Sequence, residues 1–216
     1  MTKLSKLVFV VALLLFGCGV AGASVVTSLP GGTVVPMPVV NYFGPGPQSF
    51  GSGITWTSTN AANQGGSVFG YTGGYGFGGN GSWDGALTMA GLNDSLDAWG
   101  VTDTMTFAFS TPVYGVGGFL NYVPYGSTVT TIAVFDAAHS LLESYNLTFV
   151  VGTGTDLGGF YGFLRANPDI SYFTLTDNYI GIANLSVQST ATPEPATLVL
   201  LGLGIAGLGF CRRRKA

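Results

Sequence analysis

Residues 104–109 read Thr-Met-Thr-Phe-Ala-Phe, so that polar or small side chains alternate with large apolar ones. A period of two is typical of a strand that buries one of its faces. The alternation recurs, with some slippage, in residues 128–135, which read Thr-Val-Thr-Thr-Ile-Ala-Val-Phe. Helix signals are nearly absent from the chain, because runs of Ala, Glu and Lys are few while Gly, Thr, Val, Tyr and Phe abound.

Further segments have the same strand character and are separated by Gly, Asp-Ala and Asn-Pro-Asp turns. They are residues 54–59, 113–120, 142–150, 159–164, 170–176 and 179–187. Short strands at regular spacing predict an all-β fold, an antiparallel β-sandwich, over residues 54–190. A parallel α/β fold is disfavoured because no amphipathic helix lies between the strands.

The segment before these strands, residues 24–53, is rich in proline and glycine. Proline removes a backbone donor, so it is confined to sheet edges, strand starts and loops. The prolines are Pro30, Pro36, Pro38, Pro45 and Pro47. We expect an extended lead-in or an edge segment here rather than a central strand.

Residues 65–85 interleave ten glycines with aromatic side chains. One interpretation is a loop that presents Tyr71, Tyr75 and Trp83 as a platform for sugar rings. The other is a glycine-rich hairpin whose aromatics pack onto the sandwich, and this one is favoured because loop aromatics beside a small core are usually structural.

The first 23 residues have the pattern of a signal peptide: a basic start, an apolar stretch over residues 7–16, and Ala21-Gly22-Ala23. Small residues at these positions suit signal peptidase, so we expect cleavage between Ala23 and Ser24. An alternative is a lipoprotein anchored through Cys18, because residues 15–18 loosely resemble a lipobox. Simple cleavage is favoured, since the bulky Phe16 stands where a small residue is usual.

The C-terminus carries a second pattern that is typical of a targeting segment. Pro193-Glu194-Pro195 precedes the apolar residues 196–211, and a basic stop follows, formed by Arg212, Arg213, Arg214 and Lys215. A helix of these sixteen residues would span about 24 Å. A bilayer core is about 30 Å thick and requires ~20 residues, so the segment is too short to cross it comfortably. The segment therefore suits a temporary hold in the inner membrane before cleavage better than a permanent anchor.

The order and spacing of these three parts resemble the PEP-CTERM sorting signal. That resemblance implies a Gram-negative bacterium that makes exopolysaccharide, and processing by an exosortase near Pro193-Glu194-Pro195. It further implies release to the cell surface or to the extracellular polymeric substance of a biofilm.

A second resemblance covers residues 113–187 and concerns a β-sandwich seen in many PEP-CTERM proteins. The matching pieces are residues 114–119, 133–137, 159–163 and 182–187. This resemblance implies a jelly roll of the galactose-binding kind. Ala183 stands where relatives often have Asp, which weakens any ligand or calcium role carried over through the last strand.

Charge is distributed very unevenly along the chain. Between Ser24 and Thr192 there are eight aspartates and Glu143 but a single cation, Arg165, which gives this span a net charge of −8. Nucleic-acid binding needs clustered Lys or Arg, so nucleic acid is excluded as a partner. Cys18 and Cys211 both lie in the end segments, so the body has neither a disulfide nor a cysteine-based zinc site.

No catalytic constellation stands out. His139 follows Asp136-Ala137-Ala138 in an expected hairpin turn, and no Gly-x-Ser-x-Gly elbow accompanies it. Paired carboxylates for hydrolysis would come from Asp84, Asp94, Asp97 and Asp103. The spacing of Asp94 and Asp97 favours turn chemistry, and at best a weak calcium site.

From these patterns we expect a non-catalytic exported protein of the surface or matrix, with no required cofactor, that binds exopolysaccharide or has a purely structural role. The alternative from a different class is a secreted, carboxylate-dependent polysaccharide hydrolase. Only an enzyme would generate new reducing ends on the polymer.

Overall fold

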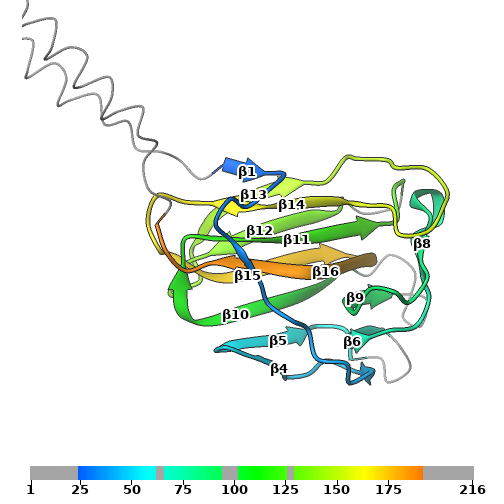
Figure 1. Ribbon diagram of the computed structural model, residues 1–216, viewed down its shortest axis with the longest axis horizontal. Coiled ribbons are helices and arrows are strands. Elements are labelled where there is room, and N and C mark those ends of the chain that lie inside the picture. Colours follow the sequence, from blue (N-terminus) through cyan, green and yellow to red (C-terminus); the bar gives the residue numbers. More distant parts are fainter. Residues whose placement is uncertain (1–23, 62–65, 94–101, 126–128, 192–216) are drawn as a thin grey trace, which may run out of the picture.

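The computed structural model describes residues 24–61, 66–93, 102–125 and 129–191. Within these ranges the chain forms sixteen strands, one short 3-10 helix, η1 (Gly78–Asn80), and no α-helix. All strand pairs within the sheets are antiparallel, and two sheets lie face to face around one core (Figure 1). The predicted antiparallel β-sandwich is therefore confirmed.

The larger sheet, sheet A, has the order β1-β14-β11-β16-β9-β6-β3, and β2 pairs with β16 as well. Its strands are β1 (Ser24–Val26), β2 (Thr33–Val34), β3 (Tyr42–Phe43), β6 (Ser67–Tyr71), β9 (Met89–Asn93), β11 (Gly115–Tyr122), β14 (Gly159–Leu164) and β16 (Tyr179–Gln188).

The smaller sheet, sheet B, has the order β13-β12-β15-β10-β5-β4. Its strands are β4 (Gln48–Gly51), β5 (Ile54–Ser58), β10 (Asp103–Val113), β12 (Thr131–Phe135), β13 (Leu141–Asn146) and β15 (Ile170–Asp177). A separate ribbon joins β7 (Tyr75–Gly76) to β8 (Ser82–Trp83).

The strand order identifies the topology. The strands from β9 to β16 appear as β9-β16-β11-β14 in sheet A and as β10-β15-β12-β13 in sheet B. Numbered from one to eight, they give the orders 1-8-3-6 and 2-7-4-5, which is the jelly roll, a pair of sheets joined by Greek-key connections. The jelly-roll prediction is thus confirmed by connectivity.

The core forms where the alternation seen in the sequence turns large side chains toward the opposite sheet. In β10, Met105 and Phe107 are fully buried, while Thr104 and Thr106, which alternate with them, are only partly covered. The largest fully buried side chains of this core include Trp56, Phe69, Phe107, Phe163 and Phe173. Burying each such ring contributes about 1.5–3 kcal/mol, so these strands specify the fold mainly through apolar burial.

Residues 24–53 are more than a lead-in. Strands β1, β3 and β4 occupy sheet edges, as expected of a proline-rich segment, while β2 lies against β16 beyond the end of β9. The segment is therefore part of the sandwich. Two other boundaries also differ: residues 147–150 form a loop after β13, and Val113 closes β10 instead of opening β11.

The register of sheet A places both ends of the described chain together. Ser24 is opposite Leu164, Leu164 is opposite Gly115, and Gly115 is opposite Gln188. Ser24 and Gln188 are thus separated by three strand spacings, about 14 Å. We call this end of the sandwich the proximal end. The distal end lies about 23 Å away, where β11 finishes at Tyr122 and its arrow points in Figure 1.

Candidate functional site

The glycine-rich segment packs on the outer face of sheet A. Tyr75 and Trp83 are buried with Phe77 in a second apolar cluster, and Trp83 is only 1% exposed. The Tyr75 hydroxyl donates to the carbonyl oxygen of Leu92, and the Trp83 indole N–H donates to that of Leu157 at 3.1 Å.

This burial corrects the sugar-platform prediction for two of its three residues. Because the rings of Tyr75 and Trp83 are covered, neither offers a face to a ligand in this arrangement. Tyr71 is partly exposed and packs edge-on against Phe43, with ring centroids 5.6 Å apart. The packing interpretation of the sequence therefore describes this segment.

Two glycines in the sheet make room for these rings. A Cβ placed on Gly181 would lie 2.9 Å from Phe77 and 3.0 Å from Trp83, and one on Gly91 would lie 3.2 Å from Tyr75. Real Cβ atoms essentially never come closer than 3.0 Å to another heavy atom. Glycine in β9 and β16 therefore lets the aromatic cluster rest directly on the sheet.

The same segment also supplies a buried hydrogen-bonding side chain, Asn80, at the distal end. The buried Asn80 amide donates to the carbonyl oxygens of Tyr122, at 3.1 Å, and Phe149, at 3.4 Å, and its oxygen accepts from the Val151 N–H at 3.0 Å. Asn121, also buried, donates to the carbonyl oxygens of Asn80 and Leu157. Together these two amides fix the loop of residues 147–157 against the end of β11.

That loop forms one wall of a cleft of about 310 Å³ at the distal end, which we call the distal groove. Its lining residues are Tyr122, Val123, Pro124, Tyr125, Val129, Thr130, Leu147, Thr148 and Val150. Tyr125 is 89% exposed, and Val129 and Val150 are exposed as well. Tyr125 also has φ of 66°, a left-handed conformation that is uncommon for a non-glycine residue and concentrates at functional loops.

Aromatic packing holds the base of the distal groove. The Tyr122 hydroxyl donates to the carbonyl oxygen of Phe149 at 2.9 Å, and the Phe149 ring stacks on Tyr161 with centroids 5.0 Å apart. Burial, followed by the nearby Asp177 carboxylate, raises the pKa of Tyr122 to about 12. The phenol is therefore neutral at physiological pH and acts as a donor.

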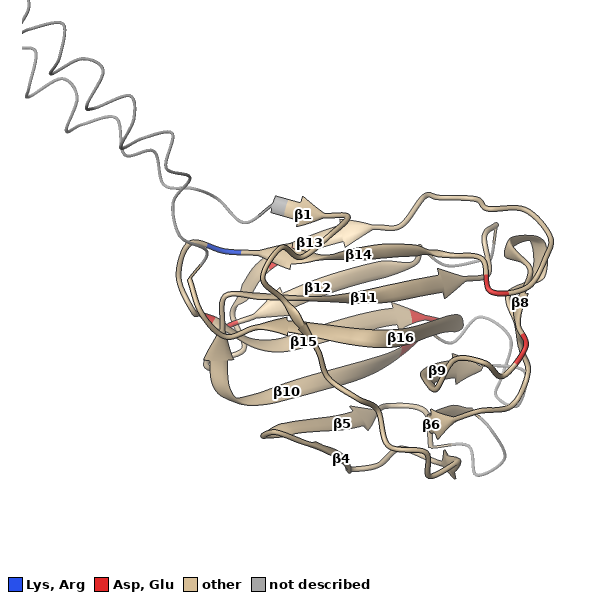
Figure 2. Ribbon diagram, viewed as in Figure 1, with Lys and Arg blue, Asp and Glu red and all other residues tan. Residues whose placement is uncertain are grey.

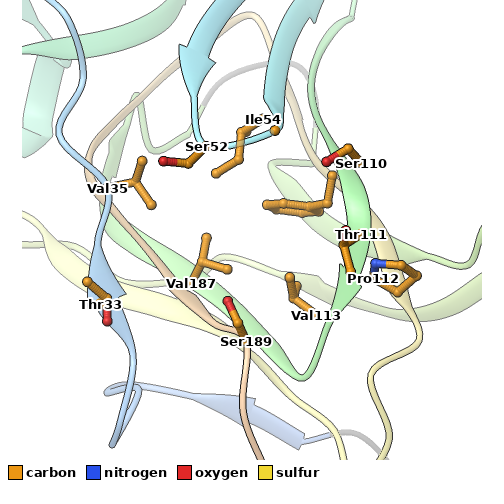
Figure 3. Close-up of a pocket in the computed structure, with 12 residues that line it drawn as sticks. Thr33, Val35, Ser52, Ile54, Ser110, Thr111, Pro112, Val113, Val187 and Ser189 are labelled. Carbon is orange, nitrogen blue, oxygen red and sulfur yellow. The ribbon is translucent and has the colours of Figure 1, made fainter.

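A second cleft of about 290 Å³, the proximal groove, lies at the opposite end. Figure 3 shows Val35, Ile54, Val113 and Val187 turned toward its centre, with serine and threonine side chains around them. Among the described residues, no charged side chain lines it. Ser189, in its wall, follows β16 directly, so this groove adjoins the place where the chain continues toward its C-terminus.

The candidate catalytic residues that the structure describes have separate surroundings. Asp84 is exposed, and its carboxylate accepts from the Ala86 N–H within its own turn, whereas Asp103 is buried in β10. His139 stacks on Tyr172 at 4.1 Å in the hairpin between β12 and β13. Asp94 and Asp97 lie outside the described residues.

The described part of the chain has little charge. Figure 2 shows one blue segment, at the end of β14, where the Arg165 guanidinium donates to the Asp169 carboxylate at 2.9 Å. Within the described ranges no group of three or more His, Cys, Asp or Glu is placed to hold a metal ion.

Sequence reasoning missed the distal groove because three separate segments build it. Tyr125 carried a usable signal, since it stands between Pro124 and Gly126 in a turn-forming sequence. Asn80 and Asn121 carried none, because nothing in the local sequence marks a buried amide that bonds to distant loops.

Comparison with solved structures finds the lectin domain of lectinolysin complexed with Lewis B antigen, with 11% identity, a TM-score of 0.32, and 48% of this chain and 73% of that chain covered. A histidine mutant of the lectin binding domain of lectinolysin, complexed with Lewis b, has 13% identity, a TM-score of 0.36, and coverage of 72% and 100%. At these TM-scores the likeness carries no argument about function. No curated protein matches the chain.

The end segments lie outside the described residues, including the predicted cleavage residues Ala21 and Ala23, the alternative anchor Cys18, and the basic stop. No helix in the described ranges is long and apolar enough to cross a membrane. The predicted C-terminal helix falls outside those ranges. A model of the PEP-CTERM protein-sorting motif matches residues 191–215, which include Pro193-Glu194-Pro195. The chain therefore carries a PEP-CTERM protein-sorting motif, the mark of an exported protein that an exosortase processes.

Proposed function

We propose that this exported protein is a non-catalytic component of the cell surface or extracellular matrix, and that its distal groove binds exopolysaccharide. The observation that carries the proposal is the Tyr125 ring, 89% exposed at the rim of a cleft. A large exposed aromatic is costly to leave in water, and its face suits the apolar face of a sugar ring.

The surroundings of Tyr125 supply the other contacts that a sugar requires. The exposed Thr148 lines the same groove, and Val129 and Val150 add apolar surface. Ligand sites typically combine apolar walls with a few polar groups that fix orientation. The network around Asn80 and Asn121 holds the walls in place, which reduces the ordering that binding would require.

The position of the groove also supports this role. The sorting motif begins at residue 191, three residues beyond the end of β16 at Gln188, at the proximal end. A protein held in the inner membrane through that segment, before exosortase releases it, would present its distal groove away from the membrane. Binding of polymer and processing of the tail would therefore occur at opposite ends of the sandwich.

The test is retention of the purified protein on the producer's own exopolysaccharide. We expect Tyr125→Ala to weaken binding about tenfold or more, which corresponds to ~1.4 kcal/mol, while Tyr125→Phe retains the ring and most of the affinity. Equal binding by both variants and the wild type would refute the role of this groove. New reducing ends on the polymer would instead indicate the hydrolase.

A further inference from the structure

Two edge strands, one from each sheet, meet along one side of the sandwich. Strand β1 is an edge strand of sheet A, and β13 is an edge strand of sheet B. Glu143 of β13 reaches across to β1, where the backbone N–H of Val25 faces its carboxylate. Figure 1 shows the two strands next to each other on that side. A single carboxylate therefore joins the two sheets beside Ser24, the first residue of β1.

The Glu143 carboxylate is incompletely satisfied. Its Oε2 is buried, and among the residues that the structure describes it has no hydrogen-bond partner, although the side chain as a whole is only partly covered. Burial raises the pKa of Glu143, while Arg165 and the Val25 N–H act in the opposite direction. A buried carboxylate oxygen without a partner costs free energy, so a further donor or cation beside it would stabilise the fold.

The nearest cation is already engaged elsewhere. Arg165 follows β14 directly, and its guanidinium forms an ion pair with Asp169, with Nη2 donating at 2.9 Å. Arg165 is the only Lys or Arg in residues 24–192. His139, in the hairpin before β13, stacks on a tyrosine of β15. Glu143 and Asp169 thus bring two negative charges to this place against the one positive charge of Arg165.

We propose that removal of the signal peptide creates the missing partner, the α-ammonium group of Ser24, and that this group forms an ion pair with Glu143. The inference rests on the predicted cleavage after Ala23. The Ser24 nitrogen lies one residue repeat, ~3.8 Å, from the Val25 nitrogen that faces the carboxylate. An ammonium group has three donors where an amide has one, so it can bond to Oε2 while Ser24 stays opposite Leu164 in β14.

The ion pair ties a short edge strand to the sandwich only after export. Strand β1 has three residues and, among the described strands, pairs with β14 alone. Short strands at a chain terminus are poorly ordered unless something ties them down. In the precursor the same nitrogen belongs to an uncharged peptide bond, whereas in the mature chain its charge balances the second carboxylate. The folded state therefore gains stability at the step that removes the signal peptide.

The experiment is thermal unfolding at pH 7, where an α-amino group is protonated, of three forms that all keep the C-terminal segment. One begins at Ser24, the second is the same chain with an Nα-acetyl group, and the third begins at Ala21. Acetylation removes the charge, and residues 21–23 move it about 10 Å away. We expect the Tm of both altered forms to be about 2–4 °C lower than that of the first.

Two substitutions show whether Glu143 is the partner. Glu143→Gln keeps the shape of the side chain but removes its charge, so it should abolish the Tm difference between the three forms. Asp84→Asn changes an exposed carboxylate and should retain the difference. Equal Tm values for the three wild-type forms, or a difference that persists in Glu143→Gln, would overturn the proposal.

Hydrogen–deuterium exchange of residues 24–26 keeps the proposal testable if Glu143→Gln fails to fold. We expect these amides to exchange faster in the acetylated form than in the form that begins with a free Ser24, and equal rates would overturn the proposal. Determination of the first residue of the exported protein should give Ser24. Any other first residue would also overturn it, because the ammonium group would then lie elsewhere.

Discussion

The side-chain amide of Asn80 bridges Tyr122 and Phe149, donating to the carbonyl oxygens of both. These residues come from the glycine-rich segment, the end of β11 and the loop after β13, so one buried side chain joins three distant parts of the chain. The distal groove depends on this junction, because Tyr122 and the residues on either side of Phe149 line it.

Replacing Asn80 should therefore loosen the groove as well as the fold. In Asn80→Ala, the carbonyl oxygens and the Val151 N–H lose their partner, and we expect the free energy of unfolding to fall by about 2–3 kcal/mol. Urea denaturation measures this loss. Asn146→Ala, which removes an exposed amide, should change stability by no more than about 0.5 kcal/mol. Similar losses in both variants would contradict the importance of the bridge.

The close contact between the aromatic cluster and sheet A makes Gly181 sensitive to a single added methyl group. Gly181→Ala would force the rings of Phe77 and Trp83 away, and overpacking of this kind costs about 1–3 kcal/mol. Gly76→Ala is the matched control, since a Cβ there meets no atom within 4 Å. Thermal unfolding compares the two variants. Equal Tm values would show that the aromatic rings can move aside at little cost in stability.

The Tyr122 phenol should make the fold sensitive to alkali. Its pKa is about 12 in the folded state and about 10 in an unfolded chain, so the folded state binds more protons between these values. The resulting stability is complete below pH 10 and is lost as the pH rises toward 12.

The variant Tyr122→Phe isolates this contribution. It lacks the hydrogen bond to Phe149, so we expect it to be less stable than the wild type by about 0.5–1.5 kcal/mol at pH 8. That difference should shrink between pH 10 and 12, as followed by urea denaturation. Burial also raises the pKa of Tyr75, so ionisation of Tyr75 destabilises the fold at high pH as well. Because Tyr75 is present in both the wild type and Tyr122→Phe, its contribution cancels in the difference between them. A difference independent of pH would contradict this assignment.

Sorting makes a separate prediction about the mature chain. If an exosortase removes the tail, mass spectrometry of protein recovered from the matrix should find a C-terminus near residues 192–195. Retention of residues 212–216 would instead indicate a permanent membrane anchor. A lipid found on Cys18 would show that the protein is a lipoprotein and that the predicted cleavage after Ala23 is wrong.

The sequence predicted the features that repeat along the chain. Alternation in residues 104–109 revealed β10, because a half-buried strand must place its apolar side chains at every second position. It could not show that residues 24–53 complete both sheets, since edge pairing depends on backbone bonds that any residue with an N–H can make. The sequence favoured packing of Trp83 onto the sandwich, but it could not show where, because the contact depends on Gly181, almost a hundred residues away.

The measurement that tests the central claim most directly is hydrogen–deuterium exchange of the wild-type protein with and without exopolysaccharide. If the distal groove binds the polymer, protection should appear in residues 122–125 and 147–151, while residues 33–35 and 109–113 of the proximal groove stay unchanged. Protection confined to the proximal groove, or none at saturating polymer, would contradict the account.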